Sequence, residues 1–412
     1  MAEISPQRLL RLRVVGLAAL AFLLMLTYSI ARPAAEGLFL KAHGSRGLPL
    51  VWLLVTFGSV AVVALYNRYL GRTGLLRLYG AVSGLSGLLL AGLLVALHAG
   101  LPGALHGLYV WKDLYVVILV EIYYSYANSV FSIQAARWVY GLFGVLSSLG
   151  GMAGSLLVSL GAERFGVTVL LWSVPAQLVV IWLVCLPFAR AAGEAPASEA
   201  ARRSSLADGV RVVRRSRYLG LMLALVAAVQ VAITLVDFEF NAVVDRTFPA
   251  EDQASAGIAK VYLAIAAVTL VLHALTGPVL RLAGVPLTLL VIPLLLGGSL
   301  GVYIALPLFV TIAVAKAASK CLDYSIFRAA KEILYIPLSY TERTAGKSVV
   351  DMVTYRVAKG GASLVLYGLV LLHAAGRLAT PLTLAVIALW TVVTVAMVRR
   401  FRGLVSREQE MG

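Results

Sequence analysis

The segment from Tyr218 to Asn241 reads YLGLMLALVAAVQVAITLVDFEFN, an apolar run long enough to cross a bilayer as a helix. Polar side chains interrupt it at Gln230, Thr234, Asp237 and Asn241. Their offsets of i, i+4, i+7 and i+11 place all four on one helix face. Charge inside a membrane costs free energy, so it tends to face a wet cavity and to mark a pathway. The segment therefore predicts a spanning helix with a functional polar face.

The rest of the chain has the composition of a membrane protein. Its 412 residues are 61% hydrophobic and 13% charged, and the mean hydropathy is +0.92. Apolar segments of roughly 20 residues recur, which predicts about twelve spanning helices. We place the spans at residues 13–33, 48–66, 75–98, 113–132, 140–160, 168–188, 218–240, 259–280, 285–303, 306–326, 348–372 and 380–397.

A polar, arginine-rich stretch divides these spans into two sets of six. We predict an N-terminal six-helix bundle at residues 1–190, a basic cytoplasmic linker at 191–217 and a C-terminal six-helix bundle at 218–412. Two such bundles joined by a loop form the major-facilitator architecture of transporters. The predicted fold class is therefore an all-α membrane protein of about twelve transmembrane helices in two bundles.

The net charge of +16 has a topological explanation. With the N-terminus inside, most of the Lys and Arg residues fall in cytoplasmic loops, as membrane topology requires. We therefore expect a multi-pass protein of the bacterial inner membrane with both termini in the cytoplasm, and no nucleic-acid partner.

The chemistry of a soluble enzyme has no support in the sequence. Cys185 and Cys321 lie far apart, and the five histidines show no metal-ligand spacing. No Walker motif is present. We expect no catalytic site, no metal and no cofactor.

Four other predicted spans carry polar stripes at helical spacing. They are Tyr28, Arg32 and Glu36 in the first span, Glu121, Ser125, Asn128 and Ser132 in the fourth, Lys316, Lys320 and Asp323 in the tenth, and Asp351, Arg356 and Lys359 in the eleventh. Hydrogen bonding between helices could equally explain the Ser and Thr members, and the eleventh-span charges could form a structural ion network.

Basic and amide side chains in these stripes are candidates for binding the substrate. They are Arg32, Lys316, Lys320, Arg356, Lys359, Asn128 and Asn241. Acids in the same spans are candidates for coupling or gating, namely Glu36, Glu121, Asp237, Asp323 and Asp351. With Glu239 added, the acids and cations nearly balance, so the charges alone do not establish an anionic substrate. Carboxylates without nearby cations could instead carry protons.

A specific family signal lies around the tenth and eleventh spans. Four blocks follow one another: DYSIF at 323–327, KEILYIPL at 331–338, GKSVVD at 346–351 and RVAKGGAS at 356–363. They resemble the ATP/ADP translocase (TLC) family of plastids and intracellular bacteria, which reads KYxLF, KExxYIPL, GKxxID and RxGKSGG there. Weaker similarity extends to Tyr28–Arg32 and to Leu235–Asp237.

The resemblance implies a facilitator fold that moves nucleotides by alternating access, coupled to a counter-substrate or to protons. At two positions the sequence differs from the family pattern in a way that bears on which substrate can bind. The family carries a lysine where this chain has Ala35, and another where it has Asn241. The loss of two cations should weaken a site for a triphosphate.

Three functions remain open from the sequence. The first is a transporter of nucleotides or related phosphorylated metabolites in the lipid bilayer. The second is a facilitator for a less anionic solute with proton coupling, which the residues Ala35 and Asn241 favour. The third is a non-transporting sensor or assembly protein. The sequence shows no output domain and no catalytic pair that would support this third function.

Overall fold

In a computed structural model, the chain is helical throughout its described parts, which are residues 6–69, 74–131, 133–193, 206–339, 342, 346–347 and 349–411. No strand occurs among these residues. The helices are α1 (Pro6–His43), α2 (Leu48–Tyr69), α3 (Leu75–His98), α4 (Ala104–Val130), α5 (Ile133–Phe165), α6 (Val167–Ala192), α7 (Leu206–Arg215), α8 (Arg217–Thr247), α9 (Glu251–Ala305), α10 (Phe309–Leu322), α11 (Arg328–Leu334), α12 (Thr354–Leu371) and α13 (Ala375–Met411). A 3₁₀ turn, η1 (Ser45–Gly47), precedes α2, and two π-helical turns, η3 (Asp323–Phe327) and η5 (Val349–Val353), precede α11 and α12.

The predicted spanning helices are confirmed. Eight helices in the described ranges are long and apolar enough to cross a membrane. One of them, α9, holds two predicted spans, because its backbone leaves the helical region at Gly284, where φ is 69°. The other three predicted spans fall on α4, α12 and the short helix α10, which has 14 residues and continues into η3 and α11. The charges of α4 and α12 set these two helices apart from the more apolar eight. The protein is a multi-pass membrane protein with an all-α fold.

The chain forms two compact units. The first comprises Met1–Gly44, Phe57–Ala201 and Phe248–Ala267, and the second comprises Ser45–Thr56, Arg202–Thr247 and Val268–Gly412. Our division into residues 1–190 and 218–412 stays a prediction. Within the predicted linker, residues 194–205 lie outside the described residues, and α7 follows them.

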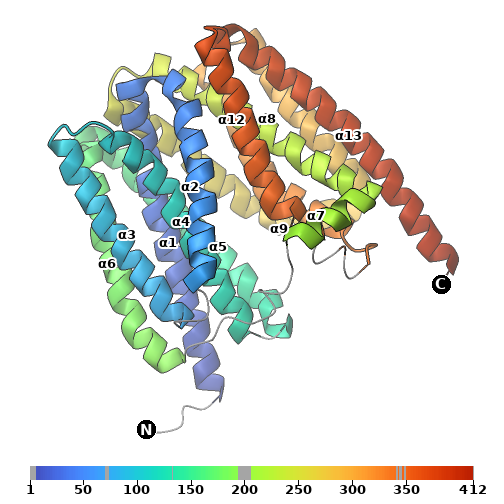
Figure 1. Cartoon of the computed structure of the whole chain (residues 1–412), viewed down its shortest axis with the longest axis horizontal. Helices are drawn as coiled ribbons and strands as arrows, with labels where there is room; N and C mark the ends of the chain where they lie inside the picture. Colours follow the sequence, from blue (N-terminus) through green and yellow to red (C-terminus); the bar gives the residue numbers. More distant parts are fainter. Residues whose placement is uncertain are drawn as a thin grey trace. The chain divides into compact units, whose positions relative to one another are not determined.

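In the first unit, α1 packs against α4, α5 and α6, and α3 packs against α4 and α6 (Figure 1). Glycines bring α1 and α5 close together. A Cβ atom on Gly150 would lie 2.2 Å from the carbonyl oxygen of Phe22, and one on Gly154 would lie 2.5 Å from that of Leu26. Only a residue without a side chain permits this approach, as is usual where membrane helices pack closely.

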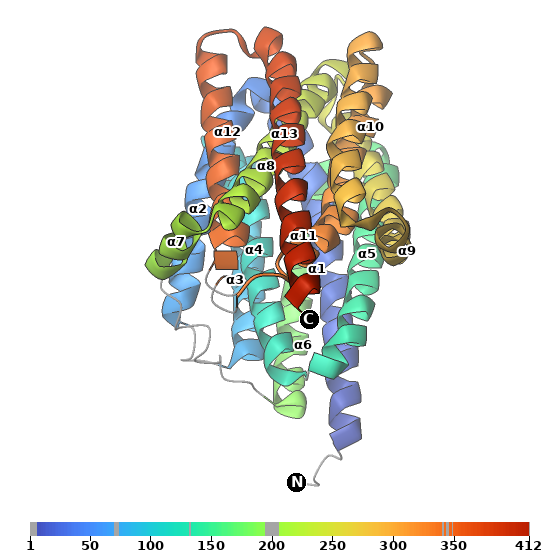
Figure 2. The ribbon, with the colours of Figure 1, turned by 90° about the vertical axis from the view of Figure 1, so that its right-hand side faces the viewer.

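In the second unit, α8 is the central helix. It packs against α10, α12 and α13, which lie around it in Figure 2. Its buried residues run from Tyr218 to Val244, so nearly the whole helix is enclosed. Any polar side chain on α8 must therefore find a partner within this unit or face a polar cavity.

Candidate functional site

A buried cluster of ion pairs joins α8 to α10 in the second unit. The Nζ of Lys316 lies 2.7 Å from Asp237 Oδ1, and the Nζ of Lys320 lies 3.0 Å from Asp237 Oδ2. The two lysines stand one helical turn apart, so they reach the same carboxylate from one face of α10. Lys316 is 1% exposed at its side chain and Lys320 9%. Two buried cations thus share one acid, which leaves the cluster with a net positive charge.

Asn241 lies one turn beyond Asp237 on α8 and is buried. Its Nδ2 donates a hydrogen bond to the backbone oxygen of Asp237 at 2.7 Å. Its Oδ1 is buried without a hydrogen-bond partner among the described residues. An unsatisfied buried acceptor is costly, so this oxygen is suited to a donor group from a ligand or water.

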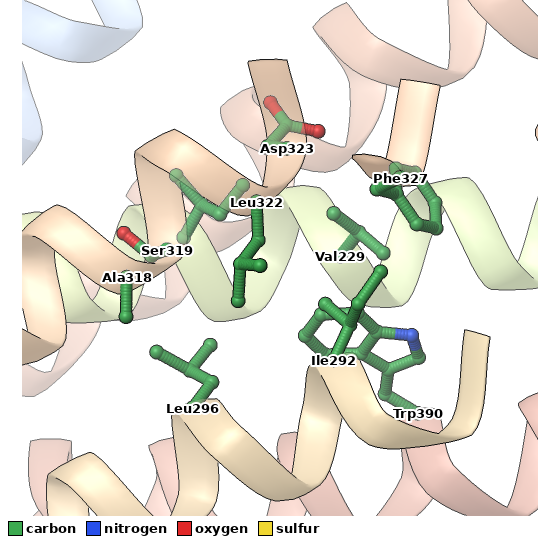
Figure 3. A pocket seen from close by; sticks show the side chains of 10 residues that line it. Val229, Ile292, Leu296, Ala318, Ser319, Leu322, Asp323, Phe327 and Trp390 are labelled. Atoms are coloured by element: carbon green, nitrogen blue, oxygen red, sulfur yellow. The ribbon is translucent and has the colours of Figure 1, made fainter. Parts of the chain in front are cut away.

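Asp323 lies beside the same cluster. It begins the π-helical turn η3 that follows α10, and π-helical turns are frequent at functional sites. Its carboxylate interacts electrostatically with Lys320 and Asp237, and also with Arg328 and Lys331. No ion pair is formed by Asp323 within the described part of the chain. Figure 3 shows the carboxylate at the edge of a small pocket, directed away from the apolar side chains of Leu322, Ile292 and Trp390.

The first turn of α12 brings an aromatic ring to this cluster. Tyr355 interacts electrostatically with Lys320, Asp323 and Asp237, and it is 44% exposed. Lys359 follows one turn later on the same face.

Arg356 and Lys359 are both half-buried. Neither makes an ion pair or a side-chain hydrogen bond among the described residues. Their predicted role in binding the substrate stays a prediction.

Two other acids of the second unit have structural partners. Asp351 Oδ1 lies 2.8 Å from Lys331 Nζ and accepts a hydrogen bond from Tyr335 at 3.0 Å, which ties η5 to α11. Glu239 is buried on α8 and accepts a 2.5 Å hydrogen bond from Thr380 of α13. Asp351 thus pairs with Lys331 of α11, and not with Arg356 or Lys359 of its own predicted span among the described residues, and its coupling role stays a prediction.

The first unit contains a separate charge cluster. Arg32 Nε donates to Glu36 Oε1 at 3.1 Å, one turn along α1. The guanidinium also lies over the ring of Tyr262, 4.2 Å from its centroid. Glu36 is buried, so the structure joins two residues that the sequence assigned to different roles, one to binding and one to gating.

Lys112 completes this cluster and was missed by the sequence analysis. It is buried, with its Nζ 3.7 Å from Glu36 Oε1 and 3.0 Å from Asp113 Oδ1. We placed the fourth span at 113–132, so Lys112 fell in a loop, whereas α4 begins at Ala104. The adjacent charges Lys112 and Asp113 were the available signal. Two cations and two acids balance here.

The fourth-span candidates lie apart from that cluster. Glu121, which the sequence places among the buried charges, is exposed, and so is Asn128. Charged groups of spanning helices tend to face a wet cavity, so this exposure does not contradict the coupling role of Glu121, which stays a prediction. Asn128 Oδ1 accepts a hydrogen bond from Tyr140, and Ser125 accepts one from Tyr66 at 3.1 Å. Ser132 lies outside the described residues.

The described residues contain no group of three or more His, Cys, Asp or Glu side chains that could hold a metal ion. The arrangement instead offers a charged, membrane-embedded site for binding and release. That combination of fold and charged clusters defines a multi-pass, all-α membrane protein with ionised side chains enclosed among its helices.

Comparison with known proteins identifies the family. The profile of the TLC ATP/ADP transporter family matches residues 106–306 and 298–402. The chain belongs to this family. It is 23% identical over 352 residues to ADP,ATP carrier protein 1 of Chlamydia muridarum, which covers 74% of this chain and 66% of that protein. It is 22% identical over 341 residues to the chloroplastic ADP,ATP carrier protein 2 of Arabidopsis thaliana. That match covers 73% of this chain and 55% of the Arabidopsis protein.

The chain thus spans about two thirds or less of the length of the curated relatives it matches.

Solved structures share its fold. A variant of the nucleoside transporter NupG matches with a TM-score of 0.66 and 12% identity, covering 95% of this chain and 99% of NupG. A bacterial homologue of the iron transporter ferroportin matches with a TM-score of 0.65 and 12% identity. That match covers 96% of this chain and 100% of the homologue.

Proposed function

We propose that the protein is a secondary transporter of nucleotides or related phosphorylated metabolites, and not an enzyme. The observation that carries this proposal is the cation cluster of the second unit. Lys316 and Lys320 are buried side by side on one carboxylate. Arg356 and Lys359 of α12 are proposed to contribute further cations to the binding of the substrate. Clustered cations of this kind recognise phosphate through charge-assisted hydrogen bonds. Family membership supports the same substrate class, because relatives are named ADP,ATP carriers.

Asp237 gives the site a means to release its ligand. A phosphate group competes with the Asp237 carboxylate for Lys316 and Lys320. When phosphate binds, the lysines exchange one anionic partner for another, so neither is left buried without a counter-charge. When phosphate leaves, Asp237 pairs with them again. Such an exchange of partners lowers the cost of emptying the site and suits alternating access.

The amide side chains Asn241 and Asn128 are proposed to contact the uncharged part of the substrate. Arg32 of the first unit is proposed to bind or gate through its pair with Glu36. Coupling is assigned to Glu36, Glu121, Asp237, Asp323 and Asp351. We infer that it operates either by exchange against a second nucleotide or with protons.

The basic residues of the predicted cytoplasmic loops favour an inner-membrane location with both termini inside.

The test of the proposal is uptake of radiolabelled nucleotide into liposomes that contain the purified full chain. Uptake that requires internal nucleotide would indicate exchange, and uptake driven by an imposed pH gradient would indicate proton coupling. No uptake of AMP, ADP or ATP under either condition would refute the proposal.

Lysine variants localise the activity. Lys316→Gln and Lys320→Gln should each abolish uptake, because each removes a cation from the proposed phosphate site. Lys260→Gln is the matched control, since Lys260 is an exposed lysine of the first unit. Equal loss of uptake in all three variants would contradict the assignment of the site.

A further inference from the structure

Asp323 is an acid placed among cations that would otherwise all favour an anionic ligand. It lies three residues after Lys320 and seven after Lys316, so it continues the face of α10 that carries both lysines. It interacts electrostatically with the cations Lys320, Arg328 and Lys331 and with Asp237. Unlike Asp237, it forms no ion pair within the described residues, so its charge is not cancelled by a bonded cation.

The position of Asp323 is built into the fold. The helix changes to π-helical pairing at this residue, and such a change rotates the following side chains relative to a regular α-helix. The carboxylate lies at the edge of the small pocket of the second unit, away from its apolar side chains (Figure 3). Tyr355, which is 44% exposed, interacts electrostatically with Lys320, Asp323 and Asp237, and also with Tyr324.

We propose that Asp323 is a specificity-determining residue that disfavours triphosphates, so that the substrate is a nucleotide with one or two phosphate groups. This inference rests on the proposed function and names the substrate class of the same site. An anion held by Lys316 and Lys320 must approach the Asp323 carboxylate. The repulsion grows with the charge of the ligand, and each added phosphate brings further negative charge near the site. Selection by a repulsive group is a common route to specificity.

The test is the affinity of the purified full chain for AMP, ADP and ATP, measured by isothermal titration calorimetry without divalent cations. The decisive quantity is the ratio of ATP affinity to AMP affinity. Asp323→Asn should raise ATP affinity about tenfold and AMP affinity much less, because like-charge contacts cost more for the more highly charged ligand. Asp323→Glu keeps the charge and should keep the wild-type ratio.

Glu332→Gln is the matched control, because it removes one negative charge from an exposed acid on α11 that pairs with Lys347. It should leave the ratio unchanged. If Asp323→Asn does not fold, Asp323→Ser provides a second neutral variant. An unchanged or lowered ratio in the neutral variant would overturn the inference and leave the proposed function standing. Absence of binding by all three nucleotides to the wild type would overturn both.

Discussion

Lys316 and Asp237 form a 2.7 Å ion pair between α10 and α8, with the lysine 1% exposed at its side chain. A lysine in that position can hold its charge only with a partner, because an unpaired ion in a medium of low polarity is costly. The pair therefore links stability and ligand binding in a single contact.

Asp237→Asn should destabilise the protein by about 3 kcal/mol, because it leaves the cations of Lys316 and Lys320 without their carboxylate. A nucleotide should restore part of that loss by supplying the missing negative charge. We expect AMP or ADP to raise the melting temperature of the variant more than that of the wild type. The double variant Asp237→Asn/Lys316→Met is the control, since it recovers stability without recovering the response. An equal response of variant and wild type would contradict the competition between Asp237 and phosphate.

Arg356→Gln and Lys359→Gln should reduce transport without the loss of stability expected for Asp237→Asn. Neither side chain has an ion pair among the described residues of α12, so the free energy of unfolding should change by about 0.5 kcal/mol or less. Nucleotide uptake in liposomes should nevertheless fall at least about tenfold, as expected when a cation is removed from a phosphate site. Thermal unfolding and uptake measured on the same preparations separate the two effects. Normal uptake in both variants would remove α12 from the proposed site.

Lys112→Met should destabilise the protein by about 3 kcal/mol, because the change breaks buried ion pairs of Lys112 with Asp113 and Glu36 and removes one cation from the cluster. Glu36 keeps its contact with Arg32 in the variant, so the cluster is weakened but not emptied. Adding Asp113→Asn to the variant should recover part of the loss, because it removes one acid and so restores the balance of cations and acids in the cluster. Chemical unfolding in detergent is the measurement. A stability equal to wild type would show that water reaches this cluster.

Gly150→Ala and Gly154→Ala should each destabilise the first unit by about 1–3 kcal/mol, because the added methyl group would overlap the backbone of α1. Gly141→Ala and Gly144→Ala are matched controls on α5, where an added Cβ meets no atom within 4 Å. The controls should be neutral or stabilising by about 0.5–1 kcal/mol, since alanine favours a helix over glycine. The melting temperatures of the four variants are the measurement. Equal losses of stability at all four positions would argue against close packing of α1 and α5.

The fold was predictable because membrane helices are defined by local composition. Twenty apolar residues specify a span wherever they occur, and Gly284, with its positive φ, separates two spans within α9. Even the charged helices α4, α10 and α12 could be recognised. The boundaries were less certain, and the late start assigned to α4 hid Lys112.

Helical periodicity also predicted which charges share a face, as with Lys316 and Lys320 on α10. It could not predict partners on other helices, since a pair between α8 and α10 depends on how the helices pack. The sequence by itself therefore determined the membrane class, the spans and the candidate charges. Only the tertiary structure decided that Asp237 is held by both lysines, that Asp351 belongs to an ion network, and that Glu121 is exposed. The physical reason is that helix formation is local, whereas the pairing of charges depends on distances between segments far apart in the chain.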